Sequence, residues 1–384
     1  MKKSLRVVAA SLIVLAGVCL LATVYVVGLS DKNAGERDFI SYWAAAQQLV
    51  HGQNPYDFQA VRALELAAGR NPSELVLMMR NPPIAFFLVL PLGFAGPKTA
   101  LIAWLFTSIG VLCLASFLMW RLNGKPDSLF NYFGFGFAPV LACLMAGQFG
   151  IFLLLGVVLF LTLYRDWPFL AGAALLLCAL KPHFFVPFGV ALLFWCLTTK
   201  NGYRILAGAC AAIAASSAFA YALDPHAWSE YSQMVRTGGA LNEVVPKLSA
   251  ELRLLIDPQA VWVQFVPEAI ACIWAAWYFW TRRASWNWMD HGLVLLLVGA
   301  VCTPYGFLPD ESLLLPAILA GVFRSIGLRR SLWPLAMIAG AALVEVMMGA
   351  EIVSRAYLWT TPAWLCWYLY ATGKFMRQPA IATA

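Results

Sequence analysis

Ionisable side chains occur at a few places where the hydrophobic runs of this sequence begin or end. The stretch "ERDF" places Asp38 after the first run, "ALKPHFF" places Lys181 and His183 after a later one, and "PYGFLPDESLLLP" places Asp310 before another. Ionisable groups near membrane depth are costly, which makes them functional candidates by default. A carboxylate takes a proton from an attacking hydroxyl, and cations stabilise a departing phosphate. The pattern is typical of group transfer from a lipid phosphate.

Each of these residues also has a purely structural explanation. Asp38 and Asp310 are suited to cap the helices that follow them, and Lys181 can extend its ammonium to the lipid headgroups. For Asp38 taken alone, capping is the better explanation. Two further polar residues at the same membrane face change this balance, namely Arg80 of "MRNPP" and Gln148 of the tight turn "AGQFG". Several such groups on one side favour a functional site.

The elements that must position these side chains are hydrophobic helices. Of the 384 residues, 62% are hydrophobic and 12% are charged, whereas soluble domains carry roughly 25% charged residues. Apolar runs recur along the whole length, many near the roughly 20 residues that cross a bilayer. We therefore predict an all-α, polytopic membrane protein with about 12 transmembrane helices. The predicted spans are 6–28, 98–120, 130–146, 150–164, 168–181, 184–198, 204–222, 259–281, 288–303, 312–324, 332–349 and 357–372.

Basic residues sort the connectors onto two sides. With the N-terminus in the cytoplasm, Lys and Arg gather in the short connectors that the positive-inside rule assigns to that side. The long connectors, 29–97 and 223–258, then lie outside, and the C-terminus is cytoplasmic. The first run is longer than a signal-peptide core and is expected to stay as an uncleaved span. We treat 1–384 as a single transmembrane domain whose chemistry faces outward.

The first outer connector contains two expected helical segments. Phe39, Trp43 and Val50 share one helical face, and His51-Gly52 ends that helix. This pattern predicts an amphipathic helix on the outer surface, with its aromatic side chains at headgroup level. The run 84–94 is bounded by prolines and is too short to span, so we expect it to lie at half depth.

Other classes of site find no support in the residue pattern. The nine cysteines lie in apolar runs without metal-ligand spacing, so we expect small buried residues, no metal and no cofactor. Glycine-rich nucleotide-binding motifs do not occur. The net charge of +7 follows from the topology, so we expect no nucleic-acid partner.

The run "DFISYWAAAQQLVHGQNPYD" resembles the first-loop signature of a family of membrane enzymes. These are the polyprenol-phosphate-mannose-dependent mannosyltransferases, glycosyltransferase family 87, which belong to the C-type (GT-C) superfamily. The resemblance continues in order through "NPPIAFFLVLPLGF", "GQFGIFLLLGVVLF", "LKPHFFVPFGVALLF" and "TPYGFLPDESLLLP". It implies a GT-C-like fold whose first outer loop carries juxtamembrane helices and the catalytic acid.

The resemblance also implies roles for individual residues. Asp38 would be the general base of an inverting transfer from a polyprenyl-phosphate sugar. The implied donor-phosphate ligands are Lys181, His183 and Arg80. The implied sugar or substrate contacts are Asp310, Gln148, Tyr42, Trp43 and Tyr56. On the acceptor side, "LNEVVPKLSAELRLLI" matches the family only at Asn242 and Arg253. The expected location is the cytoplasmic (inner) membrane, with membrane lipids and a lipid or glycan acceptor as further partners.

Two alternatives stay open. The first is another GT-C transferase that uses a different lipid-linked sugar, such as arabinose or glucose. The second is a transporter or flippase of lipid-linked sugars, which is expected to show internal repeats with broken helices that meet at mid-membrane. The sequence has no clear repeat, and its polar residues gather at one face.

Overall fold

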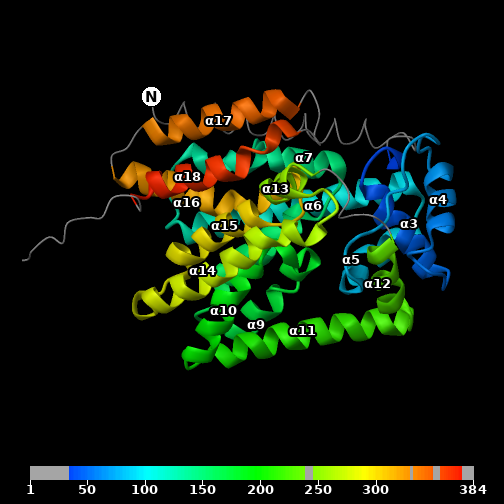
Figure 1. Ribbon diagram of the computed structural model, residues 1–384, viewed down its shortest axis with the longest axis horizontal. Coiled ribbons are helices and arrows are strands. Elements are labelled where there is room, and N and C mark those ends of the chain that lie inside the picture. Colours follow the sequence, from blue (N-terminus) through cyan, green and yellow to red (C-terminus); the bar gives the residue numbers. More distant parts are fainter. Residues whose placement is uncertain (1–33, 238–244, 329–331, 349–354, 374–384) are drawn as a thin grey trace, which may run out of the picture. The chain divides into compact units, whose positions relative to one another are not determined.

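The computed structural model describes residues 34–237, 245–328, 332–348 and 355–373. Within these ranges the secondary structure is helical and contains no strand (Figure 1), which confirms the predicted all-α class. The chain forms two compact units. The first takes its residues from Met1–Ile109 and Phe219–Met234, and the second from Gly110–Ala218 and Val235–Ala384. That residues 1–384 form a single domain stays a prediction.

The first unit consists of short helices. They are α3 (Phe39–Val50), α4 (Phe58–Ala67), η1 (Pro83–Ala85), α5 (Phe86–Val89) and η2 (Leu90–Phe94). Helices α6 (Pro97–Leu122), α11 (Gly202–Leu223) and α12 (Ala227–Thr237) belong partly to this unit and partly to the second. The predicted end of α3 is confirmed, because Gly52 follows it with a φ of 65°. The run 84–94 forms the short apolar helix that its prolines predict.

Helix α3 is buried on nearly every face, so the prediction of a surface helix is wrong. All residues from Phe39 to Leu49 except Gln47 are buried. The indole Nε1 of Trp43 donates to the carbonyl of Ala95 at 2.9 Å, and the amide of Gln47 donates to the carbonyl of Gly93 at 3.0 Å. The helix therefore packs on η2 instead of on headgroups. Hydrophobic periodicity predicts which face of a helix is apolar, but it does not predict which segment of the protein covers the opposite face.

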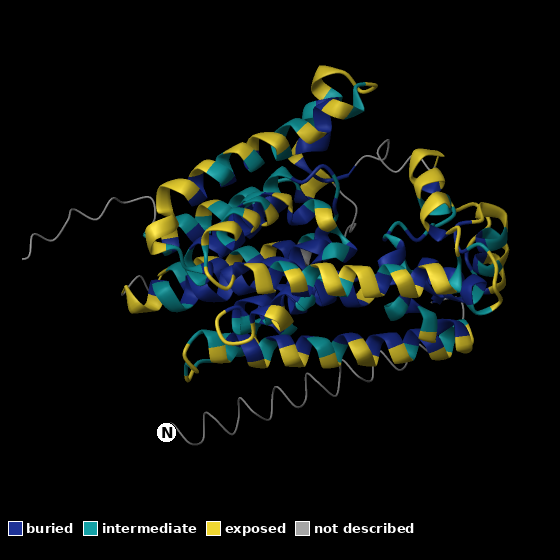
Figure 2. Ribbon diagram, turned by 90° about the horizontal axis from the view of Figure 1, so that it is seen from below, coloured by how far each residue is buried: buried dark blue, intermediate teal, exposed yellow. Residues whose placement is uncertain are grey.

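The second unit contains the longer apolar helices. Its elements up to α13 are η3 (Leu129–Phe135), α7 (Ala138–Ala146), α8 (Gly150–Leu163), α9 (Pro168–Ala174), η4 (Cys178–Leu180), η5 (Pro182–Phe184), α10 (Val186–Thr198) and α13 (Leu248–Ile256). They are followed by η7 (Val261–Phe265), α14 (Val266–Arg282), η8 (Arg283–Ser285), η9 (Trp288–Gly292), α15 (Leu293–Cys302), η10 (Leu308–Leu314), α16 (Leu315–Gly327), α17 (Leu332–Met348), η11 (Arg355–Tyr357) and α18 (Thr360–Ala371). Helix α8 is buried along most of its length and packs against α9 and η10. Figure 2 distinguishes buried from exposed helix faces.

Three helical segments of the described chain are long and apolar enough to cross a membrane. They are Pro97–Leu122, Leu129–Ala146 and Gly202–Leu223, which coincide with the predicted spans 98–120, 130–146 and 204–222. Several other predicted spans form shorter apolar helices, and the span 6–28 lies outside the described residues. The total of twelve stays a prediction.

The cysteines are less uniformly buried than the sequence predicts. Cys143, Cys178 and Cys196 are buried, but Cys113, Cys210 and Cys366 are exposed on the protein surface. The latter three lie on apolar helices. An apolar helix in a membrane protein exposes apolar residues to lipid, so an apolar run by itself does not predict burial inside the protein.

Candidate active site

A buried ion pair joins two of the predicted site residues in the second unit. The ammonium Nζ of Lys181 lies 2.5 Å from Oδ1 of Asp310 and donates a second hydrogen bond to Oε1 of Gln148 at 3.1 Å. The Asp310 side chain is fully buried, whereas that of Lys181 is 12% exposed. The structure thus brings Lys181, Asp310 and Gln148 together, although no local sequence pattern pairs them.

Local backbone geometry creates this cluster. Gly147 ends α7 in the left-handed region with a φ of 71°, which turns the chain and presents Gln148 before α8. At the start of α8, a Cβ on Gly150 would lie 2.5 Å from the carbonyl oxygen of Pro309, so only glycine lets η10 approach this closely. Oδ2 of Asp310 accepts the backbone N–H of Phe307 at 3.0 Å. Asp310 therefore both orders its own helix start and pairs with Lys181.

A second buried ion pair uses Glu311, the acid that follows Asp310 in the sequence. No pattern in the sequence predicts this pair. Nζ of Lys247 lies 3.0 Å from Oε1 of Glu311, and both side chains are 1% exposed. The hydroxyl of Thr360 donates to the same carboxylate oxygen at 2.8 Å. Burial raises the pKa of Glu311, and the nearby Lys247 opposes that shift. Two adjacent acids therefore fasten η10 to two distant segments, and neither lysine has a sequence signal that specifies its partner.

Burial shifts the titration of His183 towards the neutral form. Its Nε2 is buried and makes no hydrogen bond with the described residues. Burial lowers the pKa of His183 to about 4, with Lys181 and Lys247 acting in the same direction against Asp310. The family resemblance implies that His183 binds the donor phosphate, and a protonated ring would bind that anion by charge. The structure instead favours a neutral ring, which binds a ligand by hydrogen bonding.

We expect the pH dependence of stability to report this neutral state. The folded-state pKa lies below the ordinary value of 6.5, so the unfolded chain takes up the proton first as the pH falls. The stability that the neutral ring contributes is therefore complete above about pH 6.5 and is lost towards about pH 4. Thermal unfolding in detergent at a series of pH values should show a steeper loss for the wild type than for His183→Asn. Identical profiles would contradict the neutral assignment.

Asp38 and Arg80 belong to the first unit. Asp38 occupies the N-cap position of α3, but its side chain makes no capping hydrogen bond. The structure therefore does not support the capping explanation for this residue. The segment just before it is held by Arg70, whose Nη1 donates to the carbonyl of Gly35 at 3.1 Å. A Cβ on Gly35 would lie 2.5 Å from the backbone nitrogen of Arg70. Arg70 is thus a positioning residue for the chain at Asp38 that the sequence analysis missed.

The remaining predicted contacts are mostly buried packing residues. Tyr42 and Trp43 are 4% and 5% exposed, and Tyr42 packs against the ring of Trp104. Tyr56 is also buried, and its hydroxyl donates to the carbonyl of Asn81 at 3.4 Å. In the second unit, Arg253 is buried on α13. Asn242 lies outside the described residues.

The second unit contains an apolar groove of about 430 Å³, and some of its lining residues are close to Lys181 in the sequence. Ala179 and Pro182, which flank the Leu180–Lys181 pair, both contribute to its lining. The other lining residues come from the segment after α9 and from α10, and all are apolar or Cys: Leu175, Cys178, Phe185, Val186, Phe188, Gly189, Val190, Leu192 and Leu193. Lys181, Asp310 and Gln148 do not line the groove themselves, so the backbone around Lys181 is what connects the charged cluster to this apolar surface.

Comparison with known protein families gives a match that covers more than half of the chain. Residues 80–304 match the family described as glycosyltransferase family 87. Comparisons with curated proteins and with solved structures gave no significant match. Together with the apolar helices, the match defines a membrane enzyme that transfers glycosyl groups. The chain belongs to glycosyltransferase family 87.

The matched region contains only part of the predicted site. Lys181, His183, Gln148 and Arg80 lie inside it, whereas Asp38 precedes it and Asp310 follows it. The roles of all these residues stay predictions.

Proposed function

We propose that the protein transfers a hexose, mannose in the first instance, from a polyprenyl-phosphate donor to an acceptor hydroxyl. The transfer takes place on the extracytoplasmic face and inverts the anomeric carbon. The observation that carries this proposal is the polar cluster of Lys181, Asp310 and Gln148. An apolar groove begins at Ala179 and Pro182, which lie close to Lys181 in the sequence. A lipid phosphate has the same two parts, a charged group and an apolar chain.

The ammonium of Lys181 is suited to the phosphate. It has three N–H donors, of which Asp310 and Gln148 accept two, so one donor is left for a ligand oxygen. The carboxylate of Asp310 compensates the positive charge of Lys181 and holds the ammonium in place. The cation is therefore not buried without a partner. The buried Nε2 of His183, which has no partner among the described residues, supplies a second polar atom for a ligand.

The apolar groove suits the polyprenyl chain. All the residues that line it are apolar or Cys. Where the isoprenoid chain would otherwise meet water, its burial in the groove is favourable in proportion to the apolar area removed from water. Where it would otherwise meet lipid, the groove replaces one apolar contact by another. The adjacent residue Lys181 would then meet the phosphate at the end of that chain.

In the proposed reaction, the carboxylate of Asp38 takes the proton of the acceptor hydroxyl. The acceptor oxygen forms a bond to the anomeric carbon while the bond from that carbon to the phosphate oxygen breaks. Polyprenyl phosphate leaves with the electron pair, and its added negative charge is stabilised by Lys181. No metal or further cofactor is part of the proposal.

The test is to supply radiolabelled undecaprenyl- or decaprenyl-phosphate-mannose to the purified, membrane-reconstituted protein together with cell lipid extract. We expect the label to move to a new product while polyprenyl phosphate is released. Parallel donors with glucose or arabinose test the sugar. Consumption of one of those donors alone would replace mannose in the proposal, and movement of intact lipid-linked sugar across liposomes without transfer would overturn it.

A further inference from the structure

A polar cavity, separate from the apolar groove, lies in the second unit at the opposite end of α8 from Gln148. Its volume is about 570 Å³, within the range of ligand pockets. Three helix ends and the middle of α16 contribute to its lining. The lining residues are Leu122 and Asn123 at the end of α6, Leu161, Thr162, Tyr164, Arg165 and Asp166 at the end of α8, Asn287 and Met289 around the start of η9, and Ala320, Phe323 and Arg324 of α16. The 14 residues of α8 separate it from the Lys181 cluster by about 20 Å, so it is a different site.

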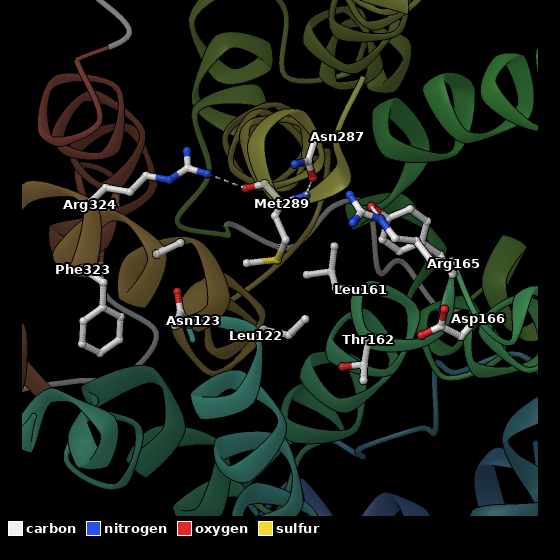
Figure 3. Close-up of a pocket in the computed structure, with 12 residues that line it drawn as sticks. Leu122, Asn123, Leu161, Thr162, Arg165, Asp166, Asn287, Met289, Phe323 and Arg324 are labelled. Atoms are coloured by element: carbon white, nitrogen blue, oxygen red, sulfur yellow. Dashed lines mark hydrogen bonds between the residues drawn. The ribbon is translucent and has the colours of Figure 1, made fainter. Parts of the chain in front are cut away.

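Two arginines line this cavity, Arg324 from α16 and Arg165 from the turn that follows α8. Figure 3 shows Arg324 and Arg165 on opposite sides of Met289. Arg324 donates to the carbonyl of Met289 and pairs with Asp290, which fixes its guanidinium. The exposed Arg165 lies over the ring of Tyr164 at 5.3 Å, and its Nε donates to the Tyr164 hydroxyl at 2.7 Å. These contacts use few of the five N–H donors of each guanidinium, and guanidinium forks match phosphate oxygens.

The rest of the lining suits a polar ester instead of a bare ion. Thr162, Asn123 and Asn287 supply a hydroxyl and two amides. The carboxylate of Asp166 also faces the cavity, where it repels a second anionic group but accepts a hydrogen bond from a hydroxyl or ammonium. A phosphate ester that carries such a donor therefore fits better than inorganic phosphate.

The surroundings favour a ligand from the membrane. Two further basic residues, Arg121 and Lys125, lie beside Leu122 and Asn123 in the sequence and attract anions. Trp167 and Phe169, close to Arg165 in sequence, are 62% and 48% exposed. Exposed aromatic residues beside basic ones are typical of the level of lipid headgroups.

We propose that this cavity binds an organic phosphate ester, supplied by the headgroup of a glycerophospholipid, with Arg165 and Arg324 as the phosphate ligands. Asp166 contacts the hydroxyl or ammonium of the headgroup. Basic pockets between transmembrane helices bind anionic headgroups in this way. The site is independent of the donor site, and the inference does not require that the proposed donor is correct.

The test measures binding of short-chain phosphatidylglycerol and phosphatidylethanolamine to the full-length protein in detergent, by the shift in unfolding temperature. Glycerol phosphate and inorganic phosphate serve as soluble arms, and a short-chain diacylglycerol serves as the arm without phosphate. We expect Arg165→Glu to weaken binding of the lipids about 10-fold, which corresponds to about 1.4 kcal/mol. The matched control is Arg283→Glu, the same charge reversal at a residue that contacts Trp280 outside the cavity, and it should bind as the wild type does.

Thr162→Trp provides a second variant, because its side chain fills the cavity without a change of charge. Equal binding by the wild type, Arg165→Glu and Thr162→Trp would overturn the proposal, and so would binding of diacylglycerol as strong as that of the phospholipids. If glycerol phosphate binds as tightly as the lipids and depends on Arg165, the phosphate-ester site is supported with a soluble source.

Discussion

Replacing Lys181 by Met is expected to lower the rate of sugar transfer strongly and to lower the unfolding temperature of the protein. The substitution leaves the carboxylate of Asp310 buried without its cation. Loss of one partner from a buried pair costs about 3–5 kcal/mol. It also removes the charge that stabilises the leaving phosphate, a loss of about 10²–10³ in rate. Thermal unfolding and the radiolabelled transfer assay measure the two effects separately.

A double variant separates stability from catalysis at this position. In Lys181→Met/Asp310→Asn the uncompensated charge is gone, and the introduced amide still offers an oxygen to the backbone N–H of Phe307. We expect most of the lost stability to return while the rate of transfer stays as low as in Lys181→Met. Recovery of transfer in the double variant would show that Lys181 acts only on the fold.

The other ion pair supplies the matched control. Lys247→Met also leaves a buried acid, Glu311, without its cation, so it should destabilise the protein by a similar amount. Lys247 is 1% exposed and is enclosed by protein, whereas Lys181 is 12% exposed and one of its donors is left for a ligand. The activity of the folded fraction should therefore fall much less in Lys247→Met than in Lys181→Met.

Replacing Asp38 by Asn is expected to lower the rate of transfer by about 10²–10⁴, the usual contribution of a general base. Asn preserves the size of the side chain and is as good as Asp at a helix N-terminus, so α3 should still form. Donor binding should stay close to that of the wild type, because the proposed role of Asp38 concerns the acceptor proton. Single-turnover transfer and equilibrium binding of the donor are the two measurements.

The same substitution at Asp57 is the control for this prediction. Asp57 caps α4 in the same unit, and its side chain accepts the backbone N–H groups of Gln59 and Ala60. Asp57→Asn alters one carboxylate at a helix N-terminus without removing the capping oxygen. It should leave transfer unchanged. Full activity of Asp38→Asn, or an equal loss in both variants, would rule out Asp38 as the base.

Features that depend on neighbouring residues could be predicted from the sequence. The all-α class and the three long apolar helices follow from runs of hydrophobic residues. The end of α3 at Val50 follows from Gly52, and the turn at Gln148 depends on Gly147, because glycine readily adopts the left-handed region. The ionisable residues at the ends of the hydrophobic runs could also be identified as candidates for a site, because charged residues are rare in this sequence.

Features that depend on distant residues were decided only by the tertiary structure. Lys181 and Asp310 are 129 positions apart, and Lys247 and Glu311 are 64 apart, so no local pattern pairs them. The neutral state of His183 depends on burial, and the packed position of α3 depends on what covers its second face. The sequence by itself determined a helical membrane protein with acids and bases at its helix ends. Tertiary packing decided which of them neutralise one another, because desolvation and pairing depend on distance in space.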